Sequence, residues 1–286
     1  MKAGFVGFGE VNTPTEIIVR KCAAAAEALK QEGVSLVSVY PVTDDYAEKD
    51  IGKALSVLQS ETFDFLVLCV AGWIPTHAVI KIAERFRHKP MVLWGLCGWM
   101  EDGRLVTTAD QAGTSALRKT MEELGYTFRY VYDIVGLPTR SGAVAAFGRA
   151  AAAAGWLRTA RVGMAGYRDM NLYGTLCDGV SLKRVIGAEI ETFELLEIVQ
   201  RYQRITPDEK AEIIEKQLSG WKFLKPAKRE SLEQAAGYYL AVSALAKERG
   251  YAAVSLKDVD GMKKLLGFPP APIFMLLAHC DDLCPI

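Results

Sequence analysis

The feature that most constrains the fold is the start of the chain, residues 2–30, where a strand, a glycine turn and an alanine-rich helix follow one another. KAGFVGF is a short and almost continuous apolar run, the pattern of a strand buried on both faces of a parallel sheet. Gly7 and Gly9 allow a tight turn as the chain leaves the sheet. Thr13 and Pro14 predict the start of the helix, as its cap and its first helical position. The chain therefore opens with the first half of a βαβ unit.

The same rhythm continues through the first half of the chain. Further strands are predicted at residues 34–40, 63–70, 90–96 and 126–134. Helices are predicted at residues 51–58, from the end of a loop at 71–77 to about residue 86, in a segment that ends at residue 123, and from residue 141 to about 157. Strands that alternate with helices in this way indicate a parallel sheet with helices on both faces. Residues 95–108 are predicted to form one long connection, and Thr107 or Asp110 to cap the helix after it.

A second strand–glycine–loop–helix unit starts at Arg161. Strands are predicted next at residues 189–193 and 251–255, helices at 175–186, 208–218, 230–249 and 258–266, and a last strand-like run at IFMLLAHC. We therefore predict an α/β fold of two consecutive Rossmann-like or flavodoxin-like parallel-sheet domains, residues 1–158 and 159–286. Because the chain ends on LCPI directly after an apolar run, we expect it to continue into a third domain that is missing here.

Composition excludes several classes of function. The chain has 286 residues, with 34 basic and 34 acidic side chains, so its zero net charge gives no support for nucleic-acid binding. No apolar run approaches the roughly 20 residues that a membrane span needs. The amino terminus lacks the pattern of a secretory signal, and we expect a cytoplasmic protein with reduced cysteines.

Ligands of open α/β sheets bind beyond the carboxyl ends of the strands. The loop after the first strand is therefore the first candidate site, and it holds Glu10, Val11, Asn12 and Thr13. Trp73 follows another buried strand, and its ring either packs against the C–H face of a sugar or covers the edge of the sheet.

Two further loops carry candidate side chains. Gln111 lies at the start of a helix, where its side-chain amide can offer both a donor and an acceptor to a hydroxyl group of a ligand. The alternative is that it is an ordinary polar residue of the first helical turn and contacts no ligand. Met170 lies in a polar cluster after the strand that begins at Arg161, where Arg168 and Asp169 either face a ligand or pair with each other. Together these loops favour a neutral, polyhydroxylated ligand over a phosphate.

Other chemistry has weaker support. Gly7 and Gly9 lack the third glycine of a dinucleotide-binding loop, because Asn12 stands in its place. A cluster near the carboxyl terminus contains residue types that can bind a metal: His279, Cys280, Asp281, Asp282 and Cys284. Its C-x3-C spacing matches no strong zinc-binding pattern, so we expect these residues to lie in a turn and at the end of a strand.

An ordered set of segments spans nearly the whole chain: GFVGFGEVN, AGWIPTHAV, KPMVLWGL, ADQAGTSALRKTMEELGY, RVGMAGYRDMNLYG and LKRVIGAEIETFELLE. In order and spacing they resemble the amino-terminal and middle domains of the L-fucose/L-arabinose isomerase family, a group of aldose–ketose isomerases. The resemblance implies carbohydrate metabolism, with isomerisation of a free sugar by an intramolecular oxidation and reduction. It also implies a divalent cation, usually Mn²⁺, whose ligands and acid–base carboxylates are expected beyond Ile286.

The resemblance carries over substrate contacts only. It implies that Gln111, Met170 and Trp73 contact the sugar, together with Glu10 or Asn12, while no catalytic or metal-binding residue falls within this sequence. It also implies a trimer or hexamer of identical chains that binds a monosaccharide. A second hypothesis is a non-catalytic sugar-binding or regulatory protein with the same two domains, because two α/β domains can bind a sugar without chemistry.

Overall fold

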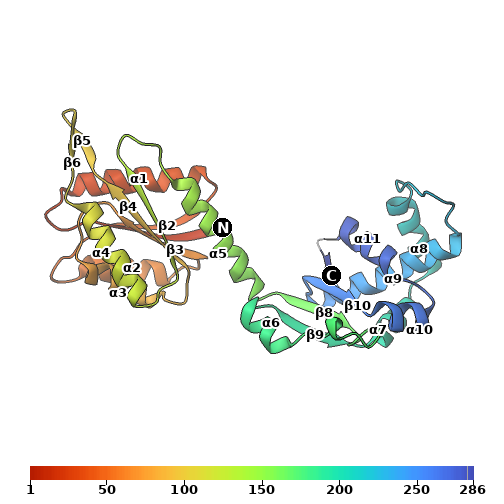
Figure 1. Cartoon of the computed structure of the whole chain (residues 1–286). Helices are drawn as coiled ribbons and strands as arrows, with labels where there is room; N and C mark the ends of the chain where they lie inside the picture. Colours follow the sequence, from red (N-terminus) through yellow and green to blue (C-terminus); the bar gives the residue numbers. More distant parts are fainter. Residues whose placement is uncertain (282) are drawn as a thin grey trace. The chain divides into compact units, whose positions relative to one another are not determined.

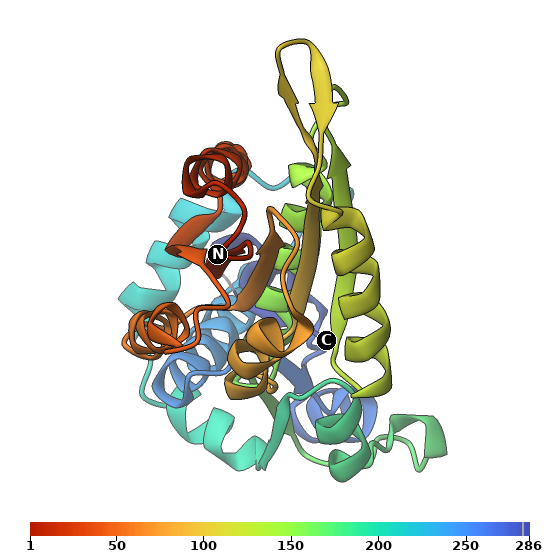
Figure 2. The same ribbon diagram turned by 90° about the vertical axis from the view of Figure 1, so that its left-hand side faces the viewer.

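The computed structural model describes residues 1–281 and 283–286, and it is seen from two directions in Figures 1 and 2. The chain divides into two compact units, Met1–Gly155 and Trp156–Ile286. The sequence prediction of an α/β fold with parallel sheets is confirmed in both units. Among the described residues, no helix is long and apolar enough to cross a membrane. The predicted boundary after residue 158 lies just past helix α5 (Ser141–Leu157), which contains the observed boundary.

The first unit is built on five parallel strands in the order β2-β1-β3-β4-β7. The strands are β1 (Lys2–Phe8), β2 (Ser35–Val42), β3 (Phe65–Val70), β4 (Met91–Cys97) and β7 (Phe128–Ile134). The helices are α1 (Thr15–Gln31), α2 (Lys49–Gln59), α3 (Thr76–Arg85), α4 (Asp110–Glu123) and α5. Helices α1 and α5 share one hydrophobic core with the sheet, and α2, α3 and α4 share the core on its opposite face.

The sequence of β1 explains both faces. Phe5 belongs to the core under α1 and α5, whereas Phe8 belongs to the core on the other side, as the two-residue period of a strand requires. Gly7 leaves room for α1, because a Cβ atom at this position would lie 2.3 Å from the Sγ of Cys22.

The connection after β4 differs from the prediction of one long loop. It contains an antiparallel hairpin, β5 (Trp99–Glu101) and β6 (Arg104–Val106), which projects beyond the carboxyl end of β4 (Figures 1 and 2). Asp102 and Gly103 form its turn with φ angles of 47° and 74°, the left-handed geometry that a two-residue hairpin loop needs. The prediction failed because each strand is three residues long, too short for a visible alternating pattern.

The second unit has four parallel strands in the order β11-β10-β8-β9. They are β8 (Arg161–Ala165), β9 (Glu189–Phe193), β10 (Ala253–Leu256) and β11 (Cys284–Pro285). The helical segments are η1 (Tyr173–Thr175), α6 (Gly179–Val185), α7 (Leu195–Tyr202), α8 (Pro207–Ile213), η2 (Ile214–Leu218), α9 (Arg229–Arg249), η3 (Asp258–Lys263), α10 (Lys264–Leu266) and α11 (Ala271–Cys280). Its hydrophobic core joins the sheet to α9 and α11, with Leu245, Val254 and Leu277 fully buried.

Two predicted elements of this unit are corrected. IFMLLAHC is not a strand but the body of α11, which begins after Pro270 and has proline in its first turn, where no amide donor is needed. The helix predicted at residues 175–186 begins only at Gly179, because Asp178 caps it by accepting the amide of Val180 at 3.0 Å. Helix α7 was not predicted at all.

Candidate functional site

The carboxyl edge of the first sheet brings together loops that are far apart in the sequence. The chain leaves β1 towards β2 on one side and reaches β3 on the other, so the topological switch point lies between β1 and β3. The loops that follow these two strands are joined by hydrogen bonds, in which the amide of Glu10 donates to the carbonyl of Trp73 at 2.6 Å and that of Gly72 to the carbonyl of Phe8 at 3.3 Å. These contacts make the two predicted site loops a single surface.

Thr13 does not cap α1 as predicted. The helix begins at Thr15 with Pro14 in the cap position, and Thr13 is turned into the protein, 2 % exposed. A Cβ atom on Gly72 would lie 3.0 Å from the Thr13 hydroxyl oxygen, which has no hydrogen-bond partner among the described residues. The threonine therefore packs the switch-point loops together, while its neighbours in the loop face outwards.

A cavity of about 350 Å³ opens beside this loop. It is lined by Val11, Asn12, Asp44, Asp45, Tyr46, Glu48, Ile51 and His77, from the loops after β1 and β2 and the first turns of α2 and α3. We call it the carboxylate cavity. Of the predicted site residues it includes Asn12, while Glu10 lies next to it in the same loop.

Hydrogen bonds to backbone amides fix two of the carboxylates. Asp44 accepts the amide of Val11 at 2.9 Å, which ties the loop after β2 to the loop after β1. Asp45 accepts the amide of Lys49 at 3.0 Å at the start of α2, where the helix dipole favours a negative charge. Neither carboxylate was predicted as a site residue from the sequence. The residues TDDY directly follow β2, so the rule that places Asn12 at the carboxyl edge of the sheet applies equally to them.

Trp73 packs against helix α4. Its ring lies on α4, where a Cβ atom at Gly113 would be 3.0 Å from the ring, and its amide donates to the hydroxyl of Thr108 at 2.9 Å. The indole is half-buried between the loop and the helix, and it does not line the carboxylate cavity.

On the other side of the switch point lies a buried ion pair. Asp110 is 1 % exposed, and its Oδ2 accepts from the Nζ of Lys21 at 3.1 Å and from the amide of Gly98 at 2.8 Å. Thr107 donates to its Oδ1 at 2.8 Å. Neither Thr107 nor Asp110 is the cap of α4, because Asp110 is already the first helical residue and its carboxylate is held by the buried lysine.

Gln111 is exposed at the start of α4. Its Oε1 lies 3.8 Å from the Sγ of Cys97, a weak contact that leaves the amide available to a ligand. Burial, followed by the nearby Asp110 carboxylate, raises the pKa of the Cys97 thiol, so this thiol is not an activated nucleophile.

Met170 belongs to the second unit and lies in the loop after β8. Its side chain is 46 % exposed, and it and Asn171 have φ angles of 48° and 57°. The amide of Met170 donates to Asp260 at 2.7 Å, and Asp169 in turn accepts the amide of Asp260 at 2.8 Å. This reciprocal pair fixes the loops after β8 and β10 to each other and presents Met170 at the carboxyl edge.

The alternative that Arg168 pairs with Asp169 is wrong. Both oxygens of Asp169 accept backbone amides of η3, at 3.0 and 2.8 Å, so its charge is satisfied by the start of that helix. Arg168 instead lies over the ring of Tyr173, 4.4 Å from its centre, and donates to the carbonyl of Leu172 at 3.3 Å.

The family resemblance implies Mn²⁺, so the His, Cys, Asp and Glu side chains of the chain are its candidate ligands. Within residues 1–281 and 283–286, no group of three or more His, Cys, Asp or Glu side chains could hold a metal ion. In the carboxyl-terminal cluster, Asp281 pairs with Lys247 at 2.8 Å and His279 packs edge-on against Trp221, while Asp282 lies outside the described residues. The described residues therefore do not fit a metal site.

No family model matches this chain, and no curated protein matches it either.

Proposed function

We propose that this chain binds a free monosaccharide and forms the sugar-contacting part of an aldose–ketose isomerase of the L-fucose/L-arabinose type. The reaction class rests on the ordered segments that resemble that family. The binding of a sugar rests on one observation, the carboxylate cavity at the carboxyl edge of β1 and β2.

The lining of the cavity matches the chemistry of a hydroxyl-rich ligand. Asp44, Asp45 and Glu48 supply acceptors for sugar hydroxyls, and Asn12 supplies both a donor and an acceptor. Asp44 and Asp45 are already oriented by backbone amides, so ordering them on binding costs little. The volume of about 350 Å³ is near the lower end of ligand pockets, which favours a monosaccharide over a dinucleotide.

Polarity also argues against a phosphorylated sugar. Lys81 pairs with Glu48. Among the described residues, the cavity lining contains three carboxylates and no lysine or arginine. A phosphate group in this cavity would face like charges, so the proposed substrate is the free sugar.

The test is calorimetric titration of the natural protein with a panel of free pentoses, hexoses and deoxyhexoses, followed by isomerase assays with and without Mn²⁺. Asn12→Ala and Asp44→Asn are expected to weaken sugar binding by about tenfold, the loss of one or two hydrogen bonds. Glu123→Gln, an exposed carboxylate on α4, is the matched control and is expected to bind as the wild type does.

The outcomes separate the two hypotheses. Binding together with Mn²⁺-dependent turnover supports the isomerase, and binding without turnover across the panel supports the non-catalytic sugar-binding protein. If no sugar binds, or if Asn12→Ala and Asp44→Asn leave the affinity unchanged, the carboxylate cavity is not the sugar site.

A further inference from the structure

Tyr46 is a fully exposed aromatic residue that lines the carboxylate cavity. It lies in the loop between β2 and α2, directly after Asp44 and Asp45, which are also lining residues. Among the described residues of the lining, the only other ring is the imidazole of His77. Trp73, which the family resemblance implies at the sugar, packs on α4 and is not among them. The cavity therefore takes its one large aromatic face from Tyr46.

The backbone on both sides of Tyr46 is held by hydrogen bonds. The residue lies in a turn that the amide of Glu48 closes by donating to the carbonyl of Asp45 at 2.9 Å. Before the turn, Thr43 donates from its amide and its hydroxyl to Asp50, at 3.2 and 2.7 Å. The position of the ring at the cavity is therefore set by an ordered turn rather than by a loose loop.

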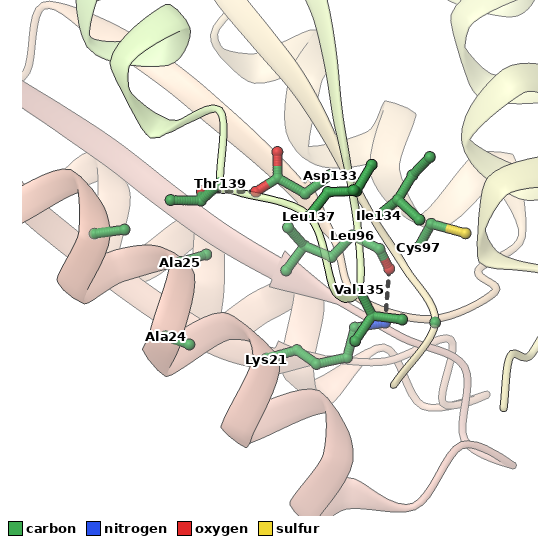
Figure 3. A pocket seen from close by; sticks show the side chains of 12 residues that line it. Lys21, Ala24, Ala25, Leu96, Cys97, Asp133, Ile134, Val135, Leu137 and Thr139 are labelled. Atoms are coloured by element: carbon green, nitrogen blue, oxygen red, sulfur yellow. Dashed lines mark hydrogen bonds between the residues drawn. The ribbon is translucent and has the colours of Figure 1, made fainter. Parts of the chain in front are cut away.

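A second cavity of the first unit is less suited to a sugar. It holds about 310 Å³ between α1 and the segment after β7, and its walls are mainly apolar, as at Leu137 (Figure 3). Its polar side chains already pair within the protein. Thr139 donates to Asp133 at 2.7 Å, and Lys21 donates to the carbonyl of Leu96 at 2.6 Å. The carboxylate cavity is therefore the better match for a hydroxyl-rich ligand.

We propose that Tyr46 is the platform on which the ring form of the sugar stacks, so that the carboxylate cavity selects a pyranose over an open-chain polyol. The inference rests on the proposed function, because it concerns the ligand of the same cavity. A pyranose carries its hydroxyl groups around its rim and C–H groups on its faces. Carboxylate acceptors and an aromatic ring in one cavity match these two kinds of surface.

An open-chain polyol suits this lining less well. Its hydroxyl groups point in several directions along a flexible chain, so it presents no lasting C–H face to the phenol ring. The chain also loses internal rotations when it binds, whereas ring closure has already removed them from the pyranose. We therefore expect a preference for cyclic ligands that depends on the ring of Tyr46.

The test is calorimetric titration of the natural protein with three forms of each sugar. These are the free sugar, its 1,5-anhydroalditol, which is locked as a ring, and its alditol, which cannot close. D-Xylose, D-galactose and L-fucose represent the pentoses, hexoses and deoxyhexoses. The wild type is expected to bind the anhydroalditol about tenfold more tightly than the alditol, and Tyr46→Ala to bind the two about equally, because the stacked face is lost.

Two further variants separate stacking from other effects. Tyr46→Phe keeps the ring and removes the hydroxyl, so it is expected to bind the anhydroalditol within about twofold of the wild type. Phe223→Ala removes an exposed aromatic side chain of the second unit and is the matched control, with wild-type binding expected. Since Tyr46 is fully exposed, Tyr46→Ala is expected to unfold in urea as the wild type does, which separates a loss of affinity from a loss of fold.

The outcomes distinguish this inference from the proposed function. If sugars bind but Tyr46→Ala binds them as tightly as the wild type, the stacking role is overturned and the sugar site stands. An alditol that binds the wild type as tightly as the anhydroalditol overturns the ring preference in the same way. If no sugar and no anhydroalditol binds, the proposed function and this inference fail together.

Discussion

At the scale of single residues, Asp110 is a charged side chain that is almost completely buried. Its carboxylate is buried with the ammonium group of Lys21, which is 9 % exposed, and both of its oxygens accept hydrogen bonds. A buried charge of this kind is tolerated only while its partner is present. Asp110 therefore joins three segments, α1, the hairpin and α4, through one side chain.

Asp110→Asn is expected to destabilise the first unit by about 3–5 kcal/mol, because it leaves the Lys21 charge buried without a counter-charge. The substitution keeps the shape of the side chain, so a cavity is not the cause. The measurement is urea unfolding. Glu123→Gln, which breaks an exposed pair with Lys119, serves as the control and is expected to change stability by about 0.5 kcal/mol or less. A loss below about 1 kcal/mol for Asp110→Asn would count against the argument.

The contact between Tyr126 and Glu84 predicts a dependence of stability on pH. Burial, followed by the hydrogen bond to Glu84, raises the pKa of Tyr126 from 10.0 to about 12. The same bond is the largest cause that lowers the pKa of Glu84 from 4.5. The phenol's contribution is complete below its ordinary pKa and is lost as the pH rises through about 12. The carboxylate's contribution is complete above 4.5 and is lost as the pH falls through its lowered pKa.

The stability difference between the wild type and Tyr126→Phe is therefore expected to be constant between these two ordinary pKa values and to shrink on either side. Urea unfolding at a series of pH values measures it, with Tyr46→Phe, a fully exposed tyrosine, as the control. A difference that is the same at every pH would show that the hydrogen bond does not contribute.

Residue-level prediction from the sequence succeeded where a local rule was sufficient. Asn12 was expected at the carboxyl edge because it follows a buried strand, and it does line a cavity there. The cap role of Thr13 failed because its hydroxyl is buried against Gly72, which follows β3. That contact forms only when the strands β1 and β3 pair in the sheet, so the residues around Thr13 in the sequence cannot predict it.

At the scale of elements, the strands β1, β3 and β4 of the first unit were predicted well because each is a nearly continuous apolar run between polar loops. Helix α11 was mistaken for a strand because a short apolar run does not distinguish a buried strand from a buried helix. The β5–β6 hairpin was not predicted because its short strands show no alternation of apolar and polar residues. It is held in place by Asp110, which lies outside the two strands. The sequence therefore identified strands correctly where both faces of the strand are buried along its whole length.

Helix α5 offers a matched pair of glycines that tests its packing on the sheet. A Cβ atom at Gly148 would lie 2.5 Å from the ring of Phe65, which is fully buried. A Cβ atom at Gly155 would have no atom of the described residues within 4 Å. Gly148→Ala is expected to cost about 1–3 kcal/mol through overpacking. Gly155→Ala is expected to be neutral or to stabilise by up to about 1 kcal/mol, since alanine favours the helix.

Thermal and urea unfolding of the two variants measure the contrast. Equal effects of Gly148→Ala and Gly155→Ala on the free energy of unfolding would mean that α5 does not lie as close to β3 as described.

At the scale of the whole molecule, the chain forms two units, each with a core of its own. Leu66 is fully buried in the first unit and Leu245 in the second. Each unit satisfies its own backbone through a separate parallel sheet. A core substitution is therefore expected to act first on the unit that contains it.

Leu245→Ala is expected to lower the stability of the second unit by about 2–5 kcal/mol, the usual cost of such a cavity. Hydrogen–deuterium exchange read out by mass spectrometry measures it as faster exchange in α9 and β10. Leu66→Ala is the reciprocal control, with faster exchange expected in the first unit. Equal loss of protection in both units for either variant would mean that the two cores unfold as one.

The sequence by itself determined the α/β class, the parallel strands of the first sheet and the edge at which its polar loops meet. These follow from apolar periodicity and from glycine turns, which act over a few residues. Only the tertiary structure decided which polar side chains share a cavity, which carboxylate is buried with Lys21 and how the hairpin is fastened. The reason is physical: these features depend on contacts between residues distant in sequence, and such contacts exist only once the sheet has brought its strands together.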